Sequence, residues 1–422
     1  MKMKKGLMWV VILCVLLTTF TYAEDEANDD VLDLNGSYAI AMDVETGEII
    51  YAKNIDQKTF PASTTKIMTA LIFAENKTKD DLLAYTENAL NQPSYSLNKD
   101  YGPISLGYQM TGDMVMKSLL IYSANDVAAM VEDNLALDGI DLMGQINQRI
   151  KDLGLTNSNY LSPNGIHDDN HYTTAYDLAQ MAIEAFSNPW IQEVLSMPEV
   201  TLQIQSGILP VKNSNQKLNN NGLIYAKTGY TPEAGRCLVA IYERDGRKIV
   251  AAVLNAEYNY EDLIVFEDMD KLMDYSFDQA ERVSYLDQVK PDFTVDLTYK
   301  PLKTFGKTVT ETMDLRYDGD FLYYPNALNQ AEVEFTYDLY DIDVDQLDKS
   351  LPVGQMTFTQ RNTSHTIDLY PAMDTEEIYD QHQDLYKQVK LYIIIGGVLA
   401  FLVLVLIFVF IRSKLRRNKR RY

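Results

Sequence analysis

The longest apolar stretch of this 422-residue chain lies near its C-terminus, at residues 391–411. A helix needs about 20 such residues to cross the core of a bilayer, where it satisfies its own backbone polar groups. The stretch therefore predicts one transmembrane helix. Seven of the next eleven residues, 412–422, are lysine or arginine. This basic tail is expected on the cytoplasmic side, which leaves the preceding chain outside the cytoplasm.

The N-terminus is built like an export signal. Three lysines among the first five residues precede an apolar run at residues 7–17, and the small residues Thr21 and Ala23 follow. This order predicts a signal peptide over residues 1–23. The alternative is an uncleaved N-terminal anchor, which the short apolar run disfavours.

The charge distribution excludes nucleic acid as a partner. Of the 37 basic residues, three lie before residue 23 and seven lie after residue 411, whereas all 60 acidic residues lie between. The intervening part has a formal net charge of −33, and such a field repels polyanions. Once the signal is removed, Cys237 is the only cysteine left. No intrachain disulfide is then possible, and a buried strand thiol is expected.

The pattern between the two ends predicts two domains. Hairpin patterns at residues 38–53 and 237–254 flank a long helical region, which predicts an α/β (α+β) domain with an antiparallel sheet covered by helices over residues 36–283. Short alternating segments then predict a small all-β domain over residues 290–373, followed by a polar spacer at 374–390. Helices are expected at residues 65–75, 111–137, 141–153, 174–186 and 261–280.

Ser63 and Lys66 form an S-x-x-K motif at the start of an expected helix. At a helix N-terminus the unsatisfied amides favour negative charge on the serine oxygen. Lys66 follows one turn later and can reach the serine from the same face. A lysine acts as a base only when it is neutral, which requires burial or a neighbouring cation. The same motif is also compatible with a non-catalytic role, in which Ser63 is a helix N-cap and Lys66 is a solvent-exposed lysine.

Two further motifs carry matching chemistry. Ser123-Ala124-Asn125 lies within the expected helix 111–137, where serine and asparagine favour a local break. Serine can relay a proton, and asparagine can both donate to and accept from a peptide group. Lys227-Thr228-Gly229 follows a strand expected at 223–226. It offers a cation and a hydroxyl to a carboxylate, and its glycine lets a substrate backbone approach closely.

The same short motifs also occur elsewhere in the chain. Ser214 and Lys217 fit S-x-x-K, and the segments 96–98 and 162–164 fit S-x-N. Ser214 is followed by a polar, asparagine-rich segment and not by an apolar helix. We therefore interpret these additional matches as chance.

The wider context of the three motifs resembles the penicillin-recognising serine enzymes. Residues 61–70 look like their active-site helix, and the family shares this motif trio. The resemblance narrows to the low-molecular-mass penicillin-binding proteins of the D-alanyl-D-alanine carboxypeptidase family and covers about residues 37–279. The segments that narrow it are residues 123–126, 164–166, 171–179, 227–231 and 234–235. It implies a β-lactamase/transpeptidase-like catalytic domain, and the β-rich region and membrane anchor suit the family architecture.

This resemblance implies a serine-type carboxypeptidase that removes the terminal D-alanine from peptidoglycan stem peptides and is acylated by β-lactams. Ser63 would attack the penultimate D-alanine carbonyl and form an acyl-enzyme. Lys66 would accept the serine proton, and Ser123 would relay a proton to the departing D-alanine. Neither a cofactor nor a metal ion is implied.

The resemblance also implies the groups that bind substrate. Asn125 would hold the substrate amide, and Lys227 and Thr228, with Gly229, would bind the terminal carboxylate region. The backbone N–H groups of Ser63 and Tyr230 would form the oxyanion hole. The protein is expected in the bacterial cell membrane as a single-pass protein with its catalytic domain outside.

Three other readings compete with this one. A class A β-lactamase shares the trio but needs a glutamate for deacylation, and the acidic residues between 156 and 174 are Asp168 and Asp169. A zinc peptidase could use His167 and His171, but the glutamate of H-E-x-x-H is missing. A wall-binding or antibiotic-sensing protein could keep the fold without turnover. Transpeptidase or endopeptidase side activity also stays open.

Overall fold

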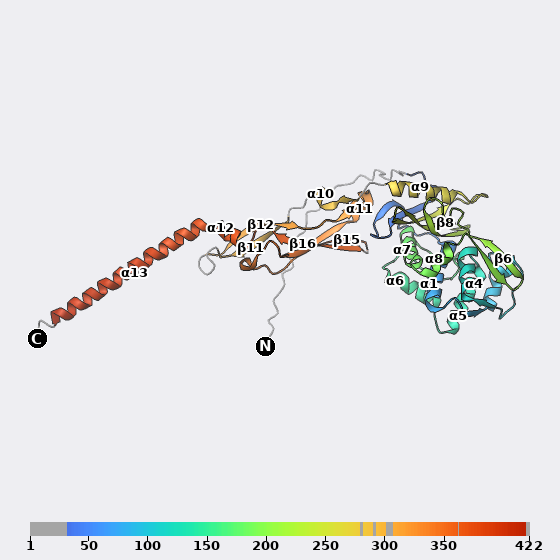
Figure 1. The fold of residues 1–422 in the computed structure, drawn as a ribbon, viewed down its shortest axis with the longest axis horizontal. Coiled ribbons are helices and arrows are strands. Elements are labelled where there is room, and N and C mark those ends of the chain that lie inside the picture. Colours follow the sequence, from blue (N-terminus) through green and yellow to red (C-terminus); the bar gives the residue numbers. More distant parts are fainter. Residues whose placement is uncertain (1–31, 279–281, 290–292, 301–306, 362, 419–422) are drawn as a thin grey trace.

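The structure is a computed structural model that describes residues 32–278, 282–289, 293–300, 307–361 and 363–418. Figure 1 shows an elongated molecule, with a helix-rich domain at one end, a β-rich domain next to it and one long helix, α13 (Gln383–Asn418), projecting at the other end. The signal peptide predicted for residues 1–23 and the end of the basic tail lie outside the described residues.

The larger domain is built on a five-stranded antiparallel sheet in the order β2-β1-β9-β8-β7. The two hairpins predicted from the sequence form its β1–β2 and β8–β9 pairs, and both are confirmed. The strands span Tyr38–Asp43 (β1), Ile49–Lys53 (β2), Leu223–Thr231 (β7), Gly235–Arg244 (β8) and Arg247–Ala256 (β9).

The expected helix over residues 111–137 is interrupted in the structure. A π-helical turn, Ser118–Tyr122, and the left-handed residue Ser123 (φ 70°) separate α4 from α5, which confirms the break expected at this motif. The longer helices of the domain are α1 (Lys66–Asn76), α4 (Gly112–Lys117), α5 (Asn125–Leu137), α6 (Leu142–Asp152), α7 (Ala175–Phe186), α8 (Pro189–Leu195) and α9 (Ile264–Asp278). Shorter elements are β3 (Leu82–Ala84), α2 (Glu87–Asn91), α3 (Leu97–Asp100) and β4 (Gln109–Thr111).

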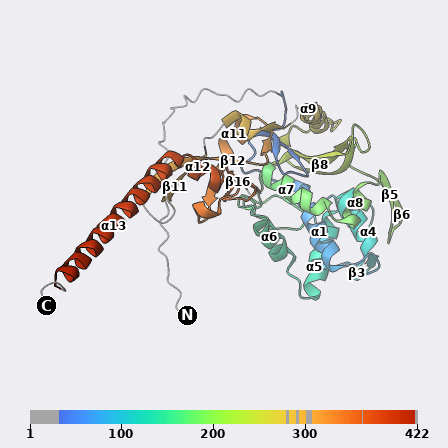
Figure 2. The same cartoon turned by 60° about the vertical axis from the view of Figure 1, so that its left-hand side comes forward.

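Helices cover both faces of the sheet (Figure 2), with α9 on one side and α1 and α7 on the other. Within β1, Ile40 and Met42 join the core cluster that contains α1 and α7, whereas Ala39 and Ala41 join the cluster that contains α9. This division follows from the alternation of side chains along a strand. Because both faces are buried, β7 is held on a rigid platform.

Strand β7 and a hairpin near it differ from the secondary structure predicted from the sequence. The strand expected at 223–226 continues to Thr231, because β7 pairs with β8 as far as Gly235. Lys227-Thr228-Gly229 therefore lies within the strand and not beyond its end. A hairpin of β5 (Glu199–Ile204) and β6 (Gly207–Lys212) was not predicted.

The smaller domain contains a second antiparallel sheet, in the order β11-β12-β16-β15-β14, around a core that includes Met356, Phe358 and Leu369. It also contains helices, so the all-β description is incomplete. The strands are β10 (Val283–Ser284), β11 (Thr294–Tyr299), β12 (Val309–Tyr317), β13 (Leu322–Tyr323), β14 (Glu334–Leu339), β15 (Gly354–Gln360) and β16 (Thr363–Pro371). The helices are α10 (Tyr285–Val289), α11 (Ala327–Glu332) and a 3-10 turn, Val344–Gln346.

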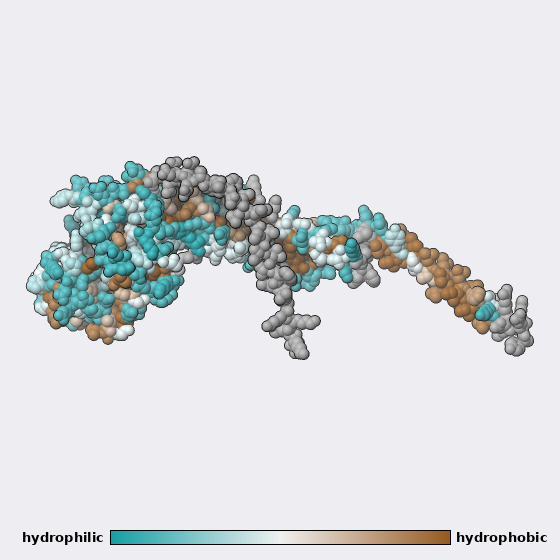
Figure 3. All heavy atoms as spheres, turned by 180° about the vertical axis from the view of Figure 1, so that it is seen from behind, coloured by the Kyte–Doolittle hydropathy of each residue, from teal (hydrophilic) through white to brown (hydrophobic). Residues whose placement is uncertain are grey.

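The segment expected as a polar spacer, residues 374–390, is largely helical. It forms α12 (Thr375–Asp380) and the first residues of α13. Within α13, Lys387–Leu415 is long and apolar enough to cross a membrane, and Figure 3 shows its surface as a continuous hydrophobic band beyond the mainly hydrophilic domains.

Candidate active site

Ser63 lies in a single 3-10 turn, Ala62–Thr65, directly before α1; we call this the nucleophile turn. Ala62 has a φ of 47°, which is uncommon for a residue with a side chain. Two glycines let other segments press against the turn. A Cβ at Gly165 would lie 1.9 Å from the Ala62 carbonyl oxygen, and one at Gly229 would lie 2.8 Å from the Ser63 amide nitrogen. The turn is thus held from two sides.

Lys66, the first residue of α1, is completely buried. Its Nζ lies 2.8 Å from Ser63 Oγ, 2.9 Å from Asn125 Oδ1 and 2.8 Å from the backbone oxygen of Asn164. Burial, and then the charge of Lys227, holds the pKa of Lys66 well below its usual range. A neutral amine at this position is able to take the proton of the Ser63 hydroxyl.

Ser123 and Lys227 form a second serine–lysine pair. Lys227 Nζ donates to Ser123 Oγ at 2.9 Å and to the Thr228 backbone oxygen at 2.8 Å. Burial, and then the charge of Arg236, lowers the pKa of Lys227 to about 7. A group with this pKa can give or take a proton at neutral pH.

Asn125 ties the segments around Lys66 together. Its Oδ1 accepts from Lys66, its Nδ2 donates to the Ser94 backbone oxygen at 2.9 Å, and its backbone N–H donates to the Tyr95 oxygen at 2.7 Å. These bonds hold the side chain in one orientation in the wall of the cavity that Ser63 and Ser123 also line.

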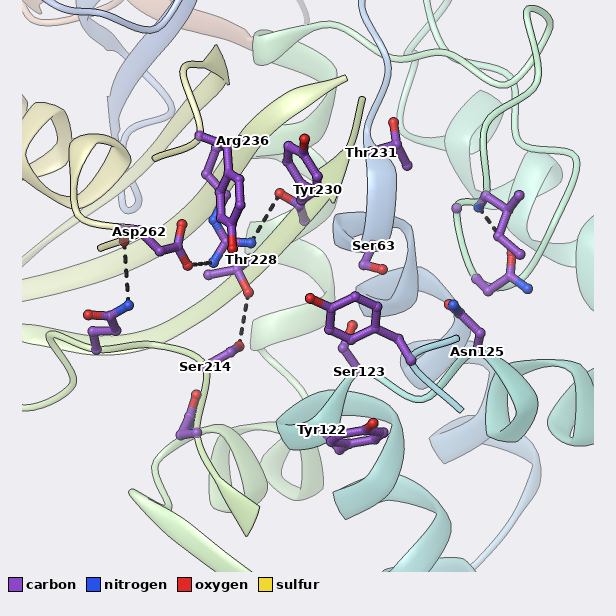
Figure 4. Close-up of a pocket in the computed structure, with 18 of the residues that line it drawn as sticks. Ser63, Tyr122, Ser123, Asn125, Ser214, Thr228, Tyr230, Thr231, Arg236 and Asp262 are labelled. Carbon is purple, nitrogen blue, oxygen red and sulfur yellow. Dashed lines mark hydrogen bonds and ion pairs between the residues drawn. The ribbon is translucent and has the colours of Figure 1, made fainter. Parts of the chain in front are cut away.

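A cavity of about 450 Å³ opens over these groups. In Figure 4, Ser63 and Asn125 lie on one side of it, and Thr228, Arg236 and Ser214 lie on the other. Aromatic rings contribute to its walls. The lining residues include Tyr95, Tyr122, Tyr230 and Tyr258, of which the last two have ring centroids 4.4 Å apart.

Ser214 belongs to the cavity, although its S-x-x-K match was interpreted as chance. Ser214 Oγ lies 2.9 Å from Thr228 Oγ1 and lines the cavity. Its S-x-x-K partner does not take part, because Lys217 pairs with Asp270 at 2.5 Å. Ser214 is therefore part of the site through its contact with Thr228 and not through an S-x-x-K motif. Asn164, from a chance S-x-N match, likewise reaches the site through its backbone oxygen.

Arg236 is the main cavity residue that sequence reasoning missed. It lies on β8, is 9% exposed, forms an ion pair with Asp262 and donates to the Gly229 backbone oxygen at 3.4 Å. The available signal was a charged residue at the start of an otherwise apolar strand. Gly229 lines the cavity, and its missing side chain also lets the nucleophile turn pack closely against it.

The fold and the two serine–lysine pairs define a serine enzyme of the penicillin-binding type. The sequence model described as D-alanyl-D-alanine carboxypeptidase matches residues 23–258, more than half of the chain. The chain belongs to this family of serine carboxypeptidases.

Individual relatives and solved structures agree with this assignment. The D-alanyl-D-alanine carboxypeptidase DacF of Bacillus subtilis is 27% identical over 291 residues, which are 66% of this chain and 72% of the relative. A penicillin-binding protein of Listeria monocytogenes, solved with ampicillin bound, is 28% identical with a TM-score of 0.51, over 58% of this chain and 99% of that chain. A Streptomyces DD-transpeptidase is 26% identical with a TM-score of 0.52, over 58% of this chain and 98% of that chain.

Proposed function

We propose that the protein removes the terminal D-alanine from peptidoglycan stem pentapeptides through an acyl-enzyme on Ser63, and that β-lactams acylate the same serine. The observation that carries this proposal is the contact of 2.8 Å between Ser63 Oγ and the buried Nζ of Lys66. A hydroxyl becomes a useful nucleophile when an adjacent base takes its proton.

In the first step, Ser63 Oγ attacks the carbonyl of the penultimate D-alanine while Lys66 takes the hydroxyl proton. The backbone N–H groups of Ser63 and Tyr230 bind the resulting oxyanion. The packing of Gly229 against the Ser63 amide supports this pairing, because it brings the next residue of β7 beside the nucleophile. One oxyanion-hole donor contributes roughly 2.7–4 kcal/mol to the transition state in related chemistry.

In the second step, the amide bond breaks and the departing D-alanine needs a proton. Ser123 relays to it the proton that Lys66 took from Ser63, which leaves Lys66 neutral again, while Lys227 donates a hydrogen bond to the Ser123 hydroxyl. Water then hydrolyses the ester on Ser63, and Lys66 returns as the base.

The substrate is held at both ends of the scissile bond. Asn125 binds the peptide amide. The terminal carboxylate is bound by Thr228 and the charge of Lys227, and Ser214 and Arg236 add a second hydroxyl and a second cation to that end of the cavity. Charge-assisted bonds of this kind are about twice as strong as neutral ones.

The proposed location follows from the two ends of the chain. The expected export signal over residues 1–23 and the candidate membrane helix with its basic tail support an active site outside the cytoplasm and a C-terminus inside. Peptidoglycan is found in that compartment.

Release of D-alanine from a peptide that ends in D-Ala-D-Ala tests the proposal. The wild type should release D-alanine and become labelled by a fluorescent β-lactam, and Ser63→Ala should lose both. Ser214→Ala, which removes the other cavity hydroxyl beside Thr228, should still become labelled. Labelling without any release, lost in Ser63→Ala, would identify a sensor and refute the carboxypeptidase.

A further inference from the structure

His171 is a buried side chain, 2% exposed, that no step above uses. It lies in the loop between α6 and α7. Its Nε2 is 2.9 Å from Thr65 Oγ1 in the nucleophile turn, and its Nδ1 accepts from the Leu161 backbone N–H at 3.1 Å. The ring of Tyr160 stacks on it with centroids 4.8 Å apart. The His171 imidazole thus links two parts of the loop and also links the loop to the nucleophile turn.

The two bonds determine the tautomer of His171. A backbone N–H can only donate, so Nδ1 must be unprotonated and the ring proton must sit on Nε2. Nε2 therefore donates to Thr65 Oγ1. Protonating the ring would place a second N–H opposite that of Leu161 and break this arrangement. Burial lowers the pKa of His171 most, and of the titratable neighbours Asp168 raises this pKa and His167 lowers it.

The same loop contacts α1 at two more points. The backbone oxygen of Asn164 accepts from Lys66 Nζ at 2.8 Å, and that of Pro163 accepts from Thr69 Oγ1 at 2.7 Å. A Cβ at Gly165 would also lie 2.7 Å from Thr65 Oγ1. The loop therefore supplies one of the oxygens that orient the catalytic amine, and its distance from the turn determines where that oxygen lies.

We propose that His171 is a positioning residue for acylation. By holding Thr65 against the loop, it fixes Ser63 and Lys66 relative to the Asn164 oxygen, so that the lysine amine points at the serine hydroxyl. The inference rests on the proposed function of Ser63 and Lys66. A misplacement of about 1 Å can reduce a rate roughly 100-fold. Loss of the hydrogen bond between His171 and Thr65 should therefore lower the acylation rate.

Two substitutions separate the two bonds of the ring. In His171→Gln the side-chain amide nitrogen reaches about as far as Nε2 and can still donate to Thr65. In His171→Asn the shorter amide can still accept from Leu161 but cannot reach Thr65. We expect the rate constant for acylation by a fluorescent β-lactam to fall about 10- to 100-fold in His171→Asn and less than about 5-fold in His171→Gln. Thr65→Val, which removes the acceptor, should match His171→Asn, and the double variant should lose no more than either.

Ser158→Ala is the matched structural control. It removes bonds of 2.8 Å to Thr173 of the same loop and to Asp177 of α7, neither of which belongs to the nucleophile turn. It should lower the melting temperature and leave acylation unchanged. Equal acylation in His171→Asn, Thr65→Val and Ser158→Ala would overturn the positioning role. If His171→Asn does not fold, the acylation rate of Thr65→Val, compared with that of Ser158→Ala, tests the positioning role. A wild type that is not acylated at all would instead refute the proposed function.

Discussion

Lys66 and Lys227 are both buried, and each amine lies within 2.9 Å of a serine hydroxyl and of at least one uncharged oxygen. Burial disfavours their charged forms, which lowers both pKa values and prepares the amines for proton transfer. These residues could be predicted because each motif is short and contiguous. Ser214 and Arg236 could not, because they reach the cavity from segments whose approach is decided by tertiary packing.

At the residue scale, Arg236→Gln should raise KM for a D-Ala-D-Ala peptide about 10- to 100-fold, the loss expected for one hydrogen bond to a charged group. It should also raise the pKa of Lys227, because the charge of Arg236 helps to lower it. Steady-state kinetics across pH 5–9 measures both. Arg244→Gln is the control, since Arg244 lies on the same strand but pairs with Asp274. An unchanged KM in Arg236→Gln would refute the carboxylate role.

A second residue-scale prediction concerns acid stability. Burial lowers the pKa of His171 to about 4, whereas an unfolded histidine binds a proton below about pH 6.5. The unfolded state therefore gains protons first, and folding stability is lost as the pH falls from 6.5 to 4, by about 3 kcal/mol in total. Urea unfolding at pH 7 and pH 4.5 should show a steeper loss for the wild type than for His171→Gln. Parallel losses would contradict the assignment.

At the element scale, local apolar periodicity predicts the β1–β2 and β8–β9 hairpins and the helices α1, α6 and α7. The β5–β6 hairpin was missed because β6 carries Pro210 and buries only one of its six residues, as an edge strand can. The extension of β7 was missed because it depends on the length of its partner β8. The ends of a strand cannot be predicted from the local sequence pattern when they depend on the length of its partner strand.

Two glycines with nearly the same φ angle test how the loop packs against the nucleophile turn. Gly165 (φ 78°) and Gly139 (φ 79°) differ in surroundings, because a Cβ at Gly139 meets nothing within 4 Å. Gly139→Ala should cost about 1–2 kcal/mol of stability, the cost of a left-handed alanine. Gly165→Ala should cost more than about 3 kcal/mol and slow acylation at least 10-fold. Denaturant unfolding and β-lactam labelling measure both, and equal effects would exclude the close packing.

At the scale of the whole molecule, polar contacts fix the smaller domain to the β1–β2 edge of the larger one. Arg361 forms two bonds of 2.8 Å to the Asp56 carboxylate, and Asn326 and Asn329 both donate to the Ile49 oxygen at 2.8 Å. The membrane helix could be predicted from its length and apolarity alone. These contacts between the domains could not be predicted, because the sequence does not indicate which polar residues pair with each other.

We infer from these contacts that the smaller domain is a pedestal that sets the active site at a fixed height above the membrane. Deleting residues 384–390 from α13 removes two helical turns and lowers the site by about 10 Å. D-alanine release from intact wall should fall, while release from a soluble peptide should not change. Reinsertion of seven unrelated helix-forming residues should restore wall activity. An equal loss on both substrates would refute the pedestal.

The identity of the acylated residue tests the central claim most directly. Trypsin cleaves after Lys58 and Lys66, so the peptide 59–66 contains Ser63 as its only serine. After reaction with benzylpenicillin, mass spectrometry should find one penicillin adduct on this peptide. An adduct on peptide 118–149, which carries Ser123, or on peptide 213–217, which carries Ser214, would contradict the account.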